Sequence, residues 1–243
     1  MQSYLQWGRE GSWQRACANR FRSGSANSGT RSSIAGPDHE AIFRLRYDAC
    51  RRIAAIEPSD GQRFDDSFDR LPNVHQLGVY IEDRLAASLR IHVLSQETPW
   101  SPALDNFPDV LEPELASNKR IVDPNRLMSD FDASRRYPEL PYVTLRLAYM
   151  AAVHFEADLV TASVRREHEA FYRREMLMRP ACPPRPYGTV NKLIGLMVID
   201  FPRDGYAIEE RRPFYKSQAS EREQLFGPSR ASGTSSKGAR TAA

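Results

Sequence analysis

Helix-like and strand-like segments alternate between Pro37 and Phe214, a stretch of 178 residues. Apolar residues at three- and four-residue spacing follow Pro37 and recur in 142–155 and 166–178, which is typical of amphipathic helices. Residues 74–94 hold two runs rich in Val, Ile and Leu around Glu82–Asp83–Arg84, and this pattern predicts a β-hairpin. Short strands are also expected at 119–122, 159–164 and 192–201. The alternation predicts an α/β domain with helices covering a central sheet.

Charge is distributed unevenly along the chain. The whole chain has a formal net charge of +3, but residues 1–36 carry +4 and residues 215–243 carry +3, which leaves residues 37–214 at −4. Segments 23–33 and 227–243 are rich in Ser, Gly and Ala and cannot bury enough apolar surface to offset chain entropy. We therefore expect disordered tails at 1–36 and 215–243 around a single domain at 37–214. The Arg- and Ser-rich start also fits an organellar transit peptide.

Several functional classes find no support in the sequence. No apolar run approaches the roughly 18 residues that a membrane span needs. Cys17, Cys50 and Cys182 form no CxxC pair and have no His at metal-ligand spacing, so we expect neither a disulfide framework nor a metal site, and a cytoplasmic location fits. The basic tails lack any nucleic-acid-binding motif, so no nucleic-acid partner is expected.

A cluster of charged residues stands out in the first part of the domain. Arg46 lies in FRLRYDAC, Asp66 and Asp69 lie in DSFD, and Arg90 lies in AASLRIHV. Taken alone, these residues fit a solvated surface network. Their order, with a Pro-rich loop after the hairpin, resembles that of the acyl-homoserine lactone synthases, and still more that of the related N-acyl amino acid synthases.

The resemblance covers roughly Asp38–Phe201 and implies the fold of the acyl-CoA N-acyltransferases (GNAT-like), with a mixed, mostly antiparallel sheet. It implies an enzyme that moves a long-chain fatty acyl group from acyl carrier protein, or from acyl-CoA, to the α-amine of an amino acid. The amine would attack the thioester directly, and no cofactor would be tightly bound. The catalytic network that the resemblance implies consists of Arg46, Asp66, Asp69, Arg90 and Arg120.

One departure from the family pattern concerns the amine acceptor. The lactone synthases carry Glu-x-Ser-Arg on the fourth strand, whereas Ser117–Arg120 reads Ser-Asn-Lys-Arg. The absence of the Glu, which that family uses toward S-adenosylmethionine, favours an amino acid as the acceptor. A lactone synthase and a non-catalytic relative that only binds acyl carrier protein remain the alternatives.

The resemblance also implies where the acyl donor binds. The pantetheine arm would lie between strands at 119–123 and 159–164, and a buried helix at 142–155 would line an acyl tunnel. The acyl- and pantetheine-binding residues expected on this basis are Ile121, Val122, Leu145, Tyr149, Thr161 and Ser163. Residues 129–143 contain no glycine, although a Gly-rich loop there would cradle the pyrophosphate of CoA. This favours acyl carrier protein as the donor.

Docking of an acidic carrier protein requires a local basic patch. Candidate docking residues are Arg165, Arg166, Arg173, Arg174 and Lys192, although neighbouring glutamates also fit an ordinary solvated helix face. His168 is a candidate acceptor of the amine proton, and a capping role is the alternative.

Overall fold

A single mixed sheet forms the centre of the protein. The computed structural model describes residues 29–33, 37–187 and 190–228. The strands are β1 (Gly29–Ser33), β2 (Val74–Ile81), β3 (Arg84–Leu94), β4 (Ile121–Ser129), β5 (Leu159–Val164), β6 (Arg179–Pro180), β7 (Arg185–Tyr187) and β8 (Val190–Asp200). Their order is β1-β2-β3-β4-β5-β8-β6, and β7 pairs with β8. Among these strands only β4 and β5 are parallel, which confirms the predicted mixed, mostly antiparallel sheet.

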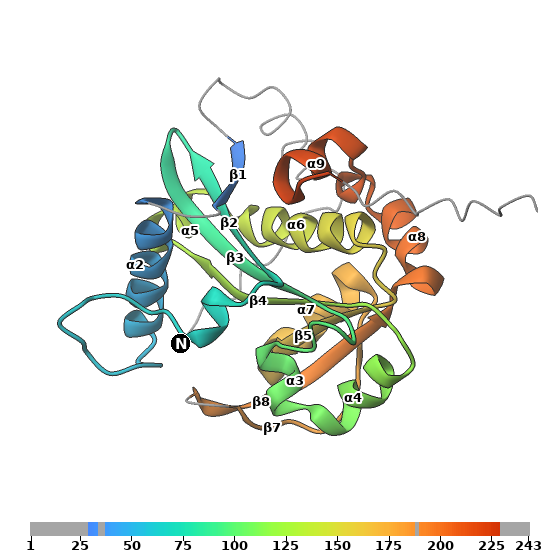
Figure 1. Ribbon diagram of the computed structural model, residues 1–243. Coiled ribbons are helices and arrows are strands. Elements are labelled where there is room, and N and C mark those ends of the chain that lie inside the picture. Colours follow the sequence, from blue (N-terminus) through green and yellow to red (C-terminus); the bar gives the residue numbers. More distant parts are fainter. Residues whose placement is uncertain (1–28, 34–36, 188–189, 229–243) are drawn as a thin grey trace, which may run out of the picture.

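Helices cover both faces of this sheet. They are α2 (Pro37–Arg52), α3 (Pro102–Asn106), α4 (Pro108–Ala116), α5 (Phe131–Arg136), α6 (Leu140–His154), α7 (Glu169–Met176), α8 (Phe201–Arg211) and α9 (Ala219–Phe226), with short 3-10 turns η1 (Ser67–Arg70), η2 (Arg166–His168) and η3 (Pro213–Tyr215). Figure 1 shows α6 and α9 on one side of the sheet and α3 and α4 on the other. None of the described helices is long and apolar enough to cross a bilayer.

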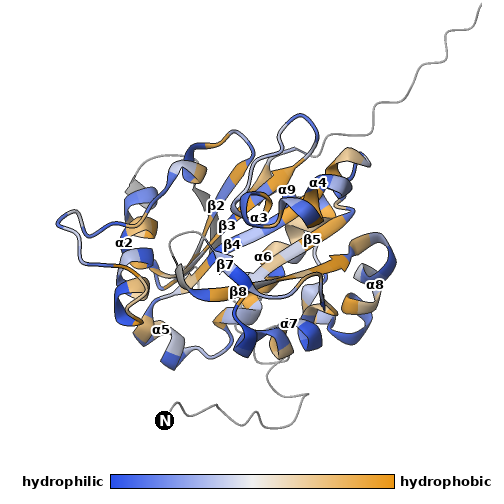
Figure 2. Ribbon diagram, turned by 90° about the horizontal axis from the view of Figure 1, so that it is seen from below, coloured by the Kyte–Doolittle hydropathy of each residue, from blue (hydrophilic) through white to orange (hydrophobic). Residues whose placement is uncertain are grey.

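The larger part of the core lies between the sheet and α6. Ala148, Ala151 and Ala152 let this helix approach the strands closely, where it packs against Leu89 and Ile91 of β3, among others. A second core lies under α3 and α4 on the opposite face. In Figure 2 hydrophobic residues concentrate on the central strands, and the outer faces of α7 and α8 carry hydrophilic residues. Helix α6 lies between the sheet and α9, so it is covered on two sides, and this explains why nearly all its residues are apolar.

The hairpin forms where the sequence predicts it. Glu82 and Asp83 both have positive φ angles, 51° and 59°, as a two-residue turn between right-twisted strands requires. Side chains alternate between the two faces of each strand. On β3, Leu89 and Ile91 face α6, so Arg90 and His92 point to the opposite face, where they contact η1 and Asp66 at its N-cap. This alternation places polar side chains of several strands on one face.

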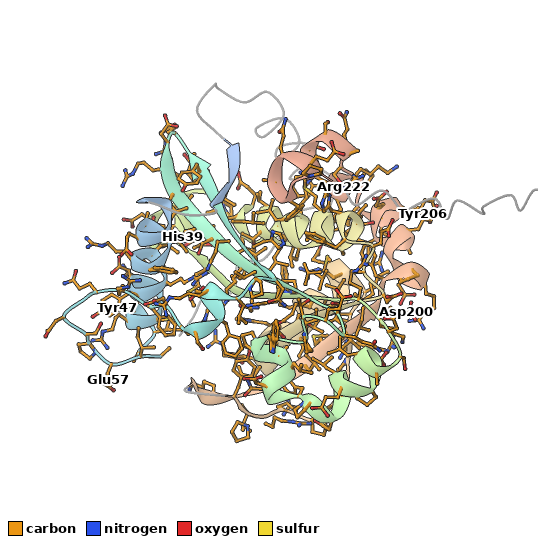
Figure 3. The ribbon with its side chains drawn as sticks, in the orientation of Figure 1. His39, Tyr47, Glu57, Asp200, Tyr206 and Arg222 are labelled. Atoms are coloured by element: carbon orange, nitrogen blue, oxygen red, sulfur yellow. The ribbon has the colours of Figure 1, made fainter. Side chains whose placement is uncertain are left out.

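The predicted C-terminal boundary of the domain is wrong. Residues 215–228 were expected to belong to a disordered tail, but Tyr215 and Leu225 are buried, and α9 contacts both α6 and β1. Figure 3 shows Arg222 on α9 and Tyr206 on α8 at the periphery of the molecule. β1 likewise lies within the predicted N-terminal tail. The rest of both predicted tails lies outside the described residues.

Candidate active site

Four elements bring the predicted charged residues together. Arg46 of α2 donates from Nη1 to Oδ1 of Asp69 in η1 (2.8 Å) and from Nη2 to Oε1 of Gln76 in β2 (2.5 Å). Gln76 donates in turn to Asp69 Oδ1 (2.6 Å), and Arg90 Nη1 of β3 lies 2.8 Å from the same oxygen. All four side chains are buried. The arrangement is therefore an internal network, and the solvated surface network is excluded.

Asp66 connects this network to β4. It accepts from Nη1 (2.5 Å) and Nη2 (3.2 Å) of Arg90 and from Nη2 of Arg126 (2.7 Å). The guanidinium of Arg126 also lies over the ring of Phe64, with Cζ 4.2 Å from the ring centroid. The φ angle of Arg126 is 52°, a conformation that L residues seldom adopt, and the β3–β4 register is irregular nearby. The local backbone thus turns Arg126 toward Asp66.

Both carboxyl groups of the network are ionised at neutral pH. Burial by itself would raise the pKa of Asp69, but the charges of Arg46 and Arg90 outweigh burial and hold that pKa well below its usual range. Burial likewise opposes ionisation of Asp66, and hydrogen bonds from Arg90 and Arg126 lower its pKa nevertheless. The network consequently holds two negative charges among three arginines.

Arg120 does not join this network, so its predicted role is wrong. It precedes β4, its side chain is 45% exposed, and it donates from Nη1 to the carbonyl of Phe155 (2.5 Å). Arg126 takes the place that was expected for Arg120. The predicted absence of an acidic residue is wrong for the same reason, because Asp123 precedes Arg126 by three residues, the spacing in Glu-x-Ser-Arg. The acidic residue and the arginine at this spacing both lie in the segment VDPNR, which extends beyond the end of the predicted strand.

A second layer of polar contacts lies behind Arg90. Asn125 accepts from Nε of Arg90 at Oδ1 (2.6 Å), and its Nδ2 lies 3.1 Å from Nδ1 of His92. Asp123 is fully buried, accepts from Thr161 at Oδ1 (2.8 Å) and accepts weakly from Asn125 at Oδ2 (3.3 Å). These contacts hold Arg90 in place from behind.

A pocket opens where β4 and β5 separate. The two strands pair only at Ile121–Leu159 and Val122–Val160 and then diverge. The gap is a pocket of about 260 Å³. Residues that line it are Arg90, Pro102, Pro124, Asn125, Arg126, Leu127, Met128, Ala162, Ser163, Val164, Arg165, His168, Tyr172, Tyr187 and Ile194. The charged network therefore forms one end of a pocket with otherwise mixed walls.

The structure separates the predicted acyl-binding residues. Of the six predicted acyl- and pantetheine-binding residues, only Ser163 lines the pocket. The hydroxyl of Thr161 donates a hydrogen bond to Asp123. Tyr149 lies on the far face of the sheet, where it donates to the carbonyl of Gly205 (3.0 Å). The remaining three members of the predicted set are buried in the core, namely Ile121, Val122 and Leu145. No residue of α6 lines this pocket, so the expected acyl tunnel along that helix stays a prediction.

Three titratable side chains of the pocket differ in proton state. Burial raises the pKa of Tyr172 to about 12, and burial together with the charge of Asp123 raises that of Tyr187. Partial desolvation and the charge of Arg165 lower the pKa of His168, whose side chain is otherwise exposed. At neutral pH the two phenols are therefore proton donors and the imidazole is a neutral acceptor. The tyrosines were missed at the sequence level because only the fold brings β7 and α7 to the pocket.

The predicted docking residues lie on or beside η2, α7 and β8, and only one of them reaches the pocket. Arg165 lines it and pairs with Glu167 (3.2 Å), while Arg174 pairs with buried Glu175 (2.7 Å). The other three members are exposed, namely Arg166, Arg173 and Lys192. Within the described part of the chain, no group of three or more His, Cys, Asp or Glu residues is placed to hold a metal ion.

Comparison with known proteins identifies the family. The model of the family described as N-acyl amino acid synthase FeeM matches residues 41–200. The chain belongs to the FeeM N-acyl amino acid synthase family. Membership confirms the predicted acyltransferase activity. No curated protein sequence matches the chain.

Several solved structures share the fold of this chain, although their sequence identity to it is low. FeeM from uncultured soil microbes is 17% identical with a TM-score of 0.59, and the match covers 72% of this chain and 91% of FeeM. The CoA-dependent acyl-homoserine lactone synthase BjaI, solved with SAM and isopentyl-CoA, is 16% identical with a TM-score of 0.58, covering 82% and 98%. The synthase LasI is 13% identical with a TM-score of 0.53, covering 82% and 94%. These matches confirm the predicted acyltransferase fold.

Proposed function

We propose that this FeeM-family member joins a long-chain acyl group, delivered by acyl carrier protein, to the α-amine of an amino acid. The observation that carries the proposal is the pocket between β4 and β5, which has Arg126 at one end and apolar side chains such as Leu127, Met128 and Ile194 along its walls. A thioester needs an apolar slot, and an amino acid needs a cation for its carboxylate. The pocket offers both.

Arg126 is suited to hold the carboxylate of the acceptor. Among the described residues it bonds to Asp66 through Nη2, and its side chain remains 22% exposed at the pocket. A guanidinium has five N–H donors, so others remain for a substrate. Arg90, by contrast, uses Nε, Nη1 and Nη2 for Asn125 and the two aspartates. Arg126 is accordingly the binding group and Arg90 its support.

The region that would cradle the pyrophosphate of CoA is unsuited to it. Residues 129–143 contain no glycine, and Glu139 stands at the N-cap of α6, between Pro138 and Pro141. A helix N-terminus attracts phosphate through its free N–H groups, and a carboxylate at that position repels it. This favours acyl carrier protein, whose docking we assign to Arg165, Arg166, Arg173, Arg174 and Lys192.

The reaction needs proton transfers on both sides of the thioester carbonyl. The acceptor amine loses a proton to His168, the C–N bond forms and the C–S bond breaks. The imidazolium of His168 then passes this proton to the departing thiolate, and the hydroxyl of Tyr172 donates a hydrogen bond to the same sulfur. Both side chains line the pocket in the required proton states. The aspartates remain ionised and serve to orient Arg90 and Arg126.

The test combines product detection with a matched pair of variants. Purified protein is given acyl carrier protein loaded with C12–C16 chains and a mixture of amino acids, and mass spectrometry is used to detect a new acyl amide. Arg126→Gln should raise KM for the amino acid roughly 10- to 100-fold, since a charged hydrogen bond contributes about 1.5–3 kcal/mol. Arg120→Gln should leave it unchanged. No amide with any donor or acceptor would refute the proposal.

A lactone synthase is the second candidate, because Asp123 restores the acidic position of the fourth strand. Asp123 is fully buried, however, and it does not line the pocket. A carboxylate held by Thr161 behind the pocket wall is poorly placed to receive an amine. Consumption of S-adenosylmethionine in the same assay would favour this candidate over the first.

A further inference from the structure

His92 lies two residues beyond Arg90 on β3, and its side chain is fully buried between η1 and β4. Nε2 lies 3.1 Å from the carbonyl oxygen of Phe68, and Nδ1 lies 3.1 Å from Nδ2 of Asn125. The ring also stands edge-on to that of Phe68, with centroids 6.0 Å apart. His92 thus contacts both the turn that carries the two aspartates and the strand that carries Arg126.

The hydrogen bonds define the protonation state of this imidazole. Oδ1 of Asn125 accepts from Nε of Arg90, so the other amide atom, Nδ2, is the donor that faces His92. Nδ1 of His92 must then accept, and Nε2 carries the proton that it donates to Phe68. Only the neutral ring with its proton on Nε2 satisfies both contacts.

A proton on Nδ1 conflicts with the placement of Arg90. Two donors, Nδ1–H and the amide of Asn125, would then face each other. Rotating the amide by 180° would relieve this contact, but it would aim the NH₂ group at Nε of Arg90, which is also a donor. It would also turn Oδ1 toward the carboxylate and carbonyl of Asp123, which now accept from Nδ2. Either arrangement breaks the support behind Arg90.

We propose that His92 is a positioning residue for the acyl transfer, which holds the amide of Asn125 in the one orientation that receives Arg90 and releases it when the ring takes up a proton. This inference rests on the proposed function, since it concerns the same pocket. It assigns His92 no contact with the substrate. Its effect passes through Asn125 and Arg90 to Asp66 and thereby to Arg126.

The charged neighbours of His92 set the direction of its pH response. Burial, the largest cause, and the charge of Arg90 disfavour the protonated ring, whereas Asp123 and Asp66 favour it. His75 of β2, which pairs with Ile91, packs against Phe155 and Phe226 on the opposite face of the sheet and does not face His92. The net result is a pKa below the usual 6.5. Activity should therefore be full at neutral pH and fall on acidification.

Two substitutions separate positioning from mere structure. His92→Asn keeps an acceptor near the position of Nδ1 but cannot titrate, so kcat should stay within about threefold and the acid limb of the pH profile should move to lower pH. His92→Leu fills the space without an acceptor, so kcat should fall about tenfold or more. Thermal unfolding checks that both fold. His39→Asn, an α2 histidine outside this network, is the control and should behave like wild type.

A readout that does not depend on activity completes the test. Long-range ¹H–¹⁵N NMR of the free protein reads the tautomer of each imidazole, and comparison with His92→Asn assigns the signal. We expect the Nε2–H tautomer at pH 7, and a protonated or Nδ1–H ring would overturn the inference. Wild-type kinetics in folded His92→Leu would overturn it as well. If no donor and acceptor react with wild type, the proposed function fails while the NMR result still decides the state of His92.

Discussion

Arg46 and Arg90 are both fully buried, and the aspartates beside them make this tolerable. Removing a charge from water is costly, and the cost is offset only when partners satisfy the buried group with good geometry. Asp69 serves both arginines with one oxygen, while its other oxygen accepts from the backbone N–H of Asp66 (2.9 Å). Asp69 is therefore the residue on which the network depends most.

Asp69→Asn should destabilise the protein strongly. It leaves two buried guanidinium groups with one carboxylate fewer, and breaking a buried pair typically costs about 3–5 kcal/mol. Urea unfolding at pH 7 measures the loss. Asp48→Asn on the exposed side of α2 is the matched control and should change stability by no more than about 0.5 kcal/mol. Equal losses in the two variants would contradict the role given to the network.

The stability lost in Asp69→Asn should depend on pH. The pKa of Asp69 lies well below its usual 3.8 in the folded protein, so its ionisation stabilises the fold above the unfolded-state pKa. That contribution is lost as pH falls toward the folded-state pKa. The stability difference between wild type and Asp69→Asn should be constant above about pH 5 and shrink below about pH 4. A difference that stays constant down to pH 3 would contradict the depressed pKa.

At the scale of elements, β4 and α9 depart most from sequence-based expectation. The predicted strand ends at Val122, whereas β4 continues to Ser129 through Pro124 and the positive φ of Arg126. Proline and an irregular register weaken the local strand signal, and pairing with β3 sustains the strand nonetheless. This is why the wrong arginine was assigned to the network. α9 escaped prediction because its sequence is polar and short.

Helix α9 is held by a few specific contacts. Phe226 packs against the rings of His75, His154 and Phe155, with centroids 5.3–5.8 Å apart, and Glu221 pairs with Arg146 (3.1 Å). A polar helix of this length has little stability of its own, so packing supplies it.

Leu225→Ala tests the docking of α9. Leu225 is 7% exposed and belongs to the core under α6, so its truncation should lower the free energy of unfolding by about 2–5 kcal/mol. Gln224→Ala, on the exposed side of the same helix, should have little effect. Denaturant unfolding of both variants gives the comparison. A Leu225→Ala protein as stable as wild type would show that α9 contributes nothing to the domain.

For the whole molecule, the net charge of +3 is a poor guide to partners. Residues 37–214, which make up most of the domain, carry −4, so they offer no long-range attraction to an acidic carrier protein. The proposed docking of acyl carrier protein would therefore rest on short-range contacts with exposed arginines such as Arg166 and Arg173, and salt would screen these contacts.

Charge reversal on this patch tests the proposed docking. Arg166→Glu together with Arg173→Glu should raise KM for acyl carrier protein at low salt, with kcat unchanged, and should flatten the dependence of KM on ionic strength. Arg84→Glu, at the exposed start of β3 next to the hairpin turn, is the control. Steady-state kinetics between low and physiological salt provide the measurement. An unchanged KM in the double variant would remove the patch from the donor site.

Periodicity and turn preference are local properties of the chain, and they were enough to predict the alternation of helices and strands and the hairpin with its turn. The resemblance to a known family added Arg46, Asp66, Asp69 and Arg90. Only the tertiary structure decided that Arg126 closes the network, that His92 and Asn125 stand behind it, and that α9 belongs to the domain. These features depend on strand pairing and on burial between segments far apart in sequence. Apart from the Asp-x-x-Arg spacing at 123–126, the local sequence specifies neither of these.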